Sequence, residues 1–176
     1  MAKNYAVVRT DRMEGTGDRN SLISVKYING SEEEAAIENG NVLKRGALAA
    51  IDATNGVYER EIFVGTAVAA GDNLDDVVLV CTPEVCYDER DRELDDFINP
   101  AGKAARAYHL RKGDIFSVTK PALDGSASPA VGNLVELKAG TKLNVVASAT
   151  NGSTQVGKII AIDVVGKYTY YVILVG

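Results

Sequence analysis

Short runs of apolar residues alternate along the chain with turns that contain glycine and asparagine, and this pattern predicts β-strands. In Ser21–Ile28 the apolar side chains Ile23, Val25 and Tyr27 occupy every second position, which places them on one face of a strand. Similar runs predict further strands at Val57–Val64, Asp76–Thr82, Asp114–Thr119, Lys142–Ala147 and Val156–Val165. Short strands at this spacing are typical of an all-β fold, a small barrel or sandwich of antiparallel strands.

The carboxyl end predicts a β-hairpin. The apolar segments Lys158–Val165 and Tyr168–Val175 flank the dipeptide Gly166-Lys167, and glycine at the first of two turn positions fits a type II′ turn. Both faces of both strands are largely apolar. We therefore expect the hairpin to lie centrally in the fold or to be covered by a partner.

Asn-Gly dipeptides predict further turns. Both residues tolerate a positive φ, which the type I′ turn of a tight hairpin requires. The chain contains four of them, at Asn29-Gly30, Asn39-Gly40, Asn55-Gly56 and Asn151-Gly152.

Two stretches interrupt the β pattern. Arg9–Asn20 is polar and contains glycine, so we expect an exposed loop or arm. Residues 84–111 are rich in charge, and their alanine-rich part, Ala101–Tyr108, is compatible with a short helix. The sequence thus predicts one β-rich domain over residues 1–176, with a strand and arm in residues 1–20. Residues 84–111 form an inserted, charged loop outside the β core, where function commonly lies.

Composition narrows the classes of function. The chain has 176 residues, a formal net charge of -5, 46% hydrophobic residues and no Trp. The acidic balance argues against nucleic acid as a partner, because phosphate binding needs a basic surface. No apolar run approaches the roughly 18 residues of a membrane helix, and the amino end lacks a secretory signal. We therefore expect a soluble protein that folds in a cytoplasm and has no membrane partner.

Candidate chemistry is sparse. Cys81 and Cys86 are the only cysteines and His109 is the only histidine, too few for a zinc site, so we interpret the cysteines as half-buried thiols. The carboxylates that could bind a divalent cation lack the spacing of a calcium loop; they are Asp88, Asp91, Asp95 and Asp96. No nucleophile and base lie in a recognisable motif. We predict no enzyme activity, no cofactor and no metal.

The chain as a whole resembles the small capsid decoration, or cement, proteins of tailed bacteriophages. The resemblance lies in the opening Met1–Val8, the Ala-, Gly- and Val-rich β scaffold, and segments such as Leu110–Thr119 and Ala139–Val145. It implies a virion structural protein, made in the bacterial host cytoplasm, which binds the major capsid protein on the outer surface of the head as a homotrimer. The family has no catalytic residues, and residues 84–111 depart from its pattern.

Partner contacts are expected at the two ends of the chain. The candidates are Lys3, Tyr5, Arg9, Arg12, Arg19, Tyr168, Tyr170 and Val172. Two alternative functions stay open: another phage structural component, such as a tail tube or baseplate protein, or a β module that binds carbohydrate or a cell surface. Sugar-binding modules usually present Trp for stacking, which this chain lacks.

Overall fold

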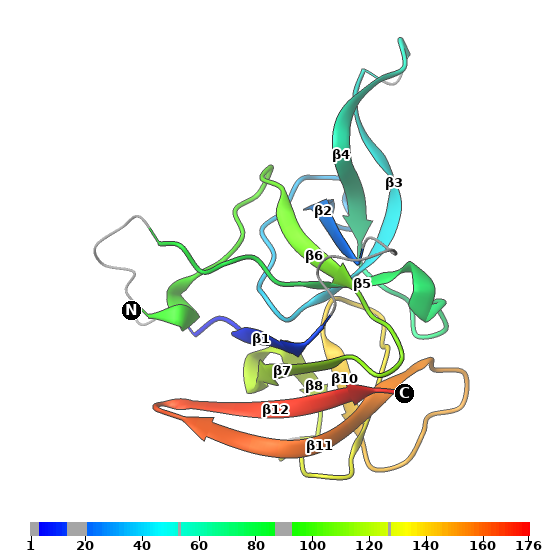
Figure 1. The fold of residues 1–176 in the computed structure, drawn as a ribbon. Helices are drawn as coiled ribbons and strands as arrows, with labels where there is room; N and C mark the ends of the chain where they lie inside the picture. The colour runs from blue at the N-terminus through cyan, green and yellow to red at the C-terminus, as the bar shows by residue number, and fades with distance from the viewer. Residues whose placement is uncertain (1–3, 14–20, 53, 87–92, 127) are drawn as a thin grey trace.

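The structure is a computed structural model that describes residues 4–13, 21–52, 54–86, 93–126 and 128–176. It confirms the all-β prediction, with strands joined by turns and short 3-10 helices (Figure 1). The strands are β1 (Val8–Arg12), β2 (Leu22–Tyr27), β3 (Val42–Asp52), β4 (Val57–Thr66), β5 (Val77–Val80), β6 (Ala105–His109), β7 (Ile115–Thr119), β8 (Leu123–Gly125), β9 (Leu134–Glu136), β10 (Leu143–Val146), β11 (Gln155–Val165) and β12 (Tyr168–Val175). The 3-10 helices are η1 (Leu74–Asp76), η2 (Leu94–Asp96) and η3 (Lys120–Ala122).

The strands form a closed barrel and an open sheet. The barrel has the order β2-β4-β3-β5-β6, and the seven-stranded sheet has the order β1-β7-β12-β11-β9-β10-β8. Most neighbours are antiparallel, as predicted, but β2 pairs with β4 and β8 pairs with β10 in parallel. Each parallel partner is reached only after an intervening strand or loop, a long-range pairing that periodicity along the chain does not reveal.

The hydrophobic core joins the barrel to the sheet. The larger cluster of buried side chains contains Val42 and Leu79 from the barrel together with Phe116 and Ile173 from the sheet. A smaller cluster fills the barrel interior around Val25, with Leu43, Val78 and Ala107. Small and β-branched side chains fill this narrow interior, and Tyr27 and Phe63 pack against them.

The predicted carboxyl-terminal hairpin is confirmed. Val165 pairs with Tyr168 across the turn, and Gly166 has a φ of 59°, as the first position of a type II′ turn requires. Strand β12 also pairs with β7, so it lies inside the sheet. The β11–β12 register shifts between Ile159 and Ala161, which marks a β-bulge.

All four Asn-Gly dipeptides lie at turns, as predicted, but the expected type I′ geometry is wrong. Gly40, Gly56 and Gly152 have positive φ, but none of the four asparagines does. At Asn55-Gly56 the reason is visible. The carboxylate of Asp52 accepts hydrogen bonds from the backbone N–H groups of Thr54 and Asn55, which stabilises a wider connection between β3 and β4.

The prediction that residues 84–111 lie outside the β core is wrong for their second half. Residues 105–109 form β6 of the barrel, where Ala105 and Ala107 are buried and Arg106 between them is exposed. The short helix occurs instead at η2, in the acidic part of the segment. Alanine has the highest helix propensity, but tertiary burial overrides propensity, and the small side chain of alanine fits a barrel interior.

The predicted exposed arm Arg9–Asn20 is also corrected in part. Its first residues, Arg9–Arg12, belong to β1 and pair with β7. Residues 14–20 lie outside the described part of the chain. The buried residues Ala6, Val7 and Val8 tie the amino end to the core.

Truncation of the fully buried Ile173 tests this core. We expect Ile173→Ala to lower the free energy of unfolding by about 2 to 5 kcal/mol, through lost burial and the remaining cavity. The matched variant Val85→Ala, at a side chain that is 56% exposed, should change it by less than about 0.5 kcal/mol. Urea unfolding measures both, and equal losses would contradict the assigned core.

Candidate functional site

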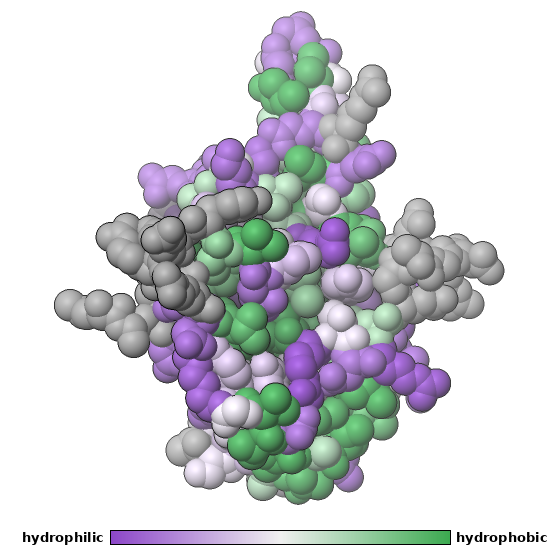
Figure 2. Space-filling view, turned by 60° about the vertical axis from the view of Figure 1, so that its left-hand side comes forward, coloured by the Kyte–Doolittle hydropathy of each residue, from purple (hydrophilic) through white to green (hydrophobic). Residues whose placement is uncertain are grey.

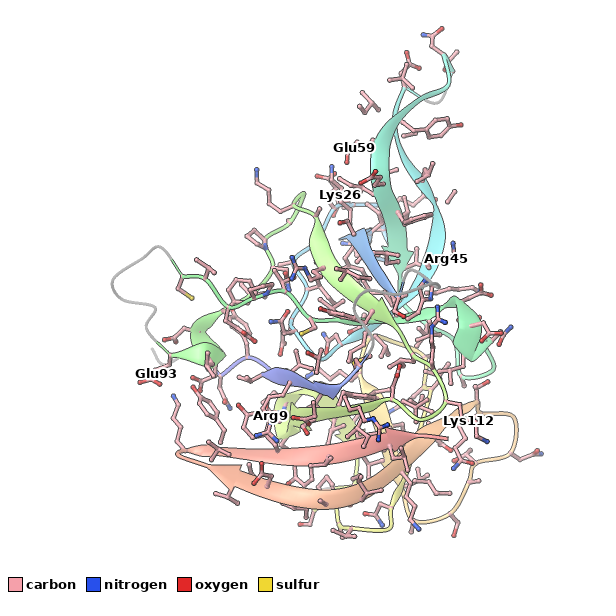
Figure 3. The ribbon with its side chains drawn as sticks, in the orientation of Figure 1. Arg9, Lys26, Arg45, Glu59, Glu93 and Lys112 are labelled. Carbon is pink, nitrogen blue, oxygen red and sulfur yellow. The ribbon has the colours of Figure 1, made fainter. Side chains whose placement is uncertain are left out.

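Three of the predicted contact residues meet where β1 and β12 flank β7, but Arg9 and Tyr168 are half-buried and Tyr170 is buried, so Tyr170 is not available to a partner. The guanidinium of Arg9 lies 4.2 Å from the ring centroid of Tyr170, and the rings of Tyr170 and Tyr168 are 6.1 Å apart. Arg9 Nη2 also donates to Asp163 Oδ2 at 2.9 Å, and its Nε lies 3.3 Å from Asp11 Oδ1. Figure 3 labels Arg9 beside the β11–β12 hairpin. These contacts fix Arg9 on its own chain, where its charge is largely compensated.

The turn of the β11–β12 hairpin is held by the acidic segment of residues 93–96. Lys167 Nζ donates to Asp95 Oδ1 at 2.8 Å, and Tyr168 Oη donates to the same oxygen at 3.0 Å. The backbone N–H of Leu94 donates to Tyr168 Oη, and that of Tyr5 donates to the carbonyl of Asp95. We call these five residues the hairpin anchor. It brings the amino end, the acidic segment and the carboxyl-terminal hairpin together.

Hydrogen bonds determine the titration of Asp95. Burial alone would raise its pKa, but the bonds from Lys167 and Tyr168 outweigh burial and hold the pKa below its usual value. The bond to Asp95 raises the pKa of Lys167. The pair is therefore charged at neutral pH.

The other predicted contacts differ in accessibility. Arg12 is exposed at the end of β1, whereas Tyr5 and Val172 are half-buried. Lys3 and Arg19 lie outside the described residues. Among the candidates that the structure describes, Arg12 is the basic side chain most accessible to a partner.

An exposed apolar strand edge was missed by the sequence analysis. We define the β11 edge as Ile160–Val165. Strand β9 pairs with β11 only as far as Lys158, so no described strand pairs with the β11 edge on that side. Its apolar side chains are 39% to 68% exposed: Ile160, Ile162, Val164 and Val165. The sequence showed an apolar hairpin but not which part of it extends past its neighbour.

A second exposed apolar surface is the projecting end of the β3–β4 hairpin, the β3–β4 arm, which we define as Gly46–Asp52 and Val57–Glu61. Strand β5 pairs with β3 only at Val42–Lys44, and β2 pairs with β4 only from Ile62 onward. The arm therefore extends from the barrel as a two-stranded ribbon (Figure 1). Its exposed apolar side chains are Leu48, Ile51, Val57 and Tyr58. Figure 2 shows apolar side chains at this tip and over the opposite end of the molecule.

The base of the arm is fixed by charged side chains. Lys26 Nζ on β2 donates to Glu59 Oε1 on β4 at 2.6 Å, and the Arg45 guanidinium lies 5.4 Å from the ring centroid of Phe63 (Figure 3). These contacts orient the ribbon relative to the barrel. An isolated two-stranded ribbon is only marginally stable, so such anchoring matters.

Two groups that could carry chemistry, His109 and Cys81, have pKa values shifted by their surroundings. His109 lines a cleft of about 840 Å³ with Arg45 and Glu61, and burial, followed by the charges of Arg45 and Arg111, lowers the pKa of its imidazole. Burial raises the pKa of the Cys81 thiol to about 12, so it is protonated at neutral pH and is a poor nucleophile. Absence of enzyme activity stays a prediction.

The described residues include neither a cluster of metal-ligand side chains nor a membrane-spanning helix. Within these residues, no three His, Cys, Asp or Glu side chains gather closely enough to hold a metal ion. No helix in the same ranges has the length and apolar character needed to cross a membrane.

Comparisons of the sequence with family models and curated proteins, and of the fold with solved structures, found no match. Any functional conclusion therefore depends on the two exposed apolar surfaces and the residues around them.

The hairpin anchor predicts a pH-dependent contribution to stability. Because the pKa of Asp95 is lowered on folding, its contribution is present above the unfolded value of about 4 and is lost as pH falls through the folded pKa. We expect Asp95→Asn to cost about 1 kcal/mol at pH 7 and progressively less below pH 4. Unfolding measured from pH 2 to 7 tests this, with exposed Glu33→Gln as control. A loss that is independent of pH would contradict the role of the charged pair.

Proposed function

We propose that this chain is a structural protein of the virion of a tailed bacteriophage, which decorates the outer surface of the head and stabilises it. The observation that carries the proposal is the pair of exposed apolar surfaces, the β11 edge and the β3–β4 arm, on an otherwise well-packed β scaffold. Monomeric proteins rarely expose contiguous apolar patches larger than roughly a few hundred Å², and larger patches are typical of protein-binding sites. The resemblance of the sequence to cement proteins supplies the kind of partner.

Preferential binding to the expanded capsid explains how such a protein would stabilise the head. A ligand that binds the expanded capsid but not its precursor stabilises the expanded lattice by mass action. Many copies bind one head, so modest contacts at each site add up, especially where each decorating unit has several capsid contacts. A rigid β scaffold loses little conformational entropy on binding, which favours this role.

Self-association is part of the proposal. In a homotrimer, each subunit would present the same capsid-binding surface, and three weak contacts would act together. The exposed apolar surfaces supply area for subunit contacts. The accessible basic residue Arg12, with Lys3 and Arg19 nearby in the sequence, is our candidate for the contact with the major capsid protein.

A second candidate is a ring component of the phage tail. The projecting arm favours it, because subunits of a closed ring contact their neighbours through two different surfaces. Binding to isolated heads separates the two candidates, since a tail component would bind none.

The proposal predicts selective binding to expanded heads. We expect the purified protein to co-sediment with expanded heads that lack it and not with unexpanded precursor heads. Reversal of the candidate charges by Lys3→Glu, Arg12→Glu and Arg19→Glu should weaken binding at least tenfold, because like charges would replace complementary ones.

The matched control reverses three basic residues elsewhere on the surface: Lys103→Glu, Lys112→Glu and Lys142→Glu. It changes the net charge equally and should bind as the parent does. Equal weakening by both triple variants would show a nonspecific charge effect. Failure of the parent protein to bind expanded heads would contradict the proposed function.

A further inference from the structure

The β11 edge has backbone groups available for hydrogen bonding. Val165 and Tyr168 flank a two-residue turn, where such residues exchange both backbone hydrogen bonds. The backbone N–H and C=O groups of successive residues point to opposite sides of a strand. Those of Ile162 and Val164 therefore point away from β12, toward the side where no described strand pairs. The sole charged side chain of this edge, Asp163, is paired with Arg9. The usual protection of an edge by free lysine or by proline is absent from it.

The arm offers a matching edge. Within Gly46–Ile51 of β3, Leu48 and Ala50 pair with β4 on one side, in a register that shifts around each of them. No strand of the described chain pairs with the segment on the other side. This segment carries no charge, and Leu48 and Ile51 are 40% and 67% exposed. It is as long as the β11 edge, about 20 Å at 3.3 Å per residue. Each edge is therefore of a length and character that a strand of the other could pair with.

The two edges lie at opposite ends of the molecule. In Figure 1 the arm projects from the barrel on the side away from the β11–β12 hairpin, and Figure 2 shows apolar surface at both ends. Complementary surfaces that are far apart on one subunit cannot satisfy each other within it. They favour a heterologous contact, in which each subunit binds the next through different surfaces and the set closes into a ring.

We propose that the β3–β4 arm of one copy pairs, through Gly46–Ile51, with the β11 edge of a second copy, and that this contact builds the oligomer. The pairing adds a strand to the open sheet and covers the exposed apolar side chains of both surfaces. The inference rests on the self-association in the proposed function but not on capsid binding.

Two complementary variants test the contact. The edge variant carries Ile162→Lys and Val164→Lys, and the arm variant carries Leu48→Lys and Ile51→Lys; exposed lysines block edge pairing with little effect on the fold. Controls that add lysine outside both edges are Val85→Lys and Thr54→Lys, both at exposed positions. Circular dichroism checks the fold, and analytical ultracentrifugation gives the mass of each variant and of an equimolar mixture.

We expect trimers for the parent and the controls, monomers for each double variant, and dimers for the mixture. The mixture stops at dimers because only the intact arm of the edge variant and the intact edge of the arm variant can pair. A double variant that still self-associates by itself, a mixture that stays monomeric, or a monomeric parent would overturn the proposal. If a double variant is unfolded, the single changes Val164→Lys and Ile51→Lys, at the most exposed positions, must give the same pattern.

The outcome is separable from that of the proposed function. If the parent and the variants give the expected masses but the trimer does not bind expanded heads, the contact between copies is supported and head decoration is refuted. If the parent is a monomer that decorates expanded heads, head decoration is supported and the contact between copies is refuted.

Discussion

Strand β12 is the element on which the rest of the open sheet depends. It pairs with β7 on one side and β11 on the other, and its buried Ile173 and Val175 belong to the core that also contains Val42 and Leu79 of the barrel. In the sheet order, β7 connects β1 to β12, and β11 connects β9 to β12. The last residues of the chain therefore position both the amino end and the join between sheet and barrel.

The same arrangement creates the exposed surfaces. Strand β11 is longer than the stretch that β9 covers, so its second half extends beyond the sheet. In the barrel, β3 and β4 are likewise longer than the segments paired with β5 and β2, and their excess length becomes the arm. Both surfaces thus arise from a mismatch in strand length at the edge of a well-packed unit. Contact with another molecule would satisfy their unpaired backbone groups and cover their apolar side chains.

Local patterns predicted β2, β4, β5, β7, β10 and the carboxyl-terminal hairpin, because alternation and the Gly166 turn depend on neighbouring residues. Strands β3, β8 and β9 were not predicted. Local patterns did not predict β6, because burial in the barrel outweighs the helical tendency of the alanine-rich segment. They also did not predict that Arg9 contacts Asp163 and Tyr170, which lie far along the chain. Of the candidate contacts, Arg9, Tyr168 and Tyr170 were brought together, but by bonds within the chain. The exposed edges were missed because exposure depends on where a neighbouring strand ends.

The central claim, that this protein decorates the outside of a phage head, is tested most directly by electron cryomicroscopy of expanded heads incubated with it. The account predicts added density on the outer surface at threefold positions of the lattice, into which three copies of the fold can be placed with each arm against a neighbouring copy. Heads whose outer surface is unchanged under saturating protein, or density confined to the tail vertex, would contradict it.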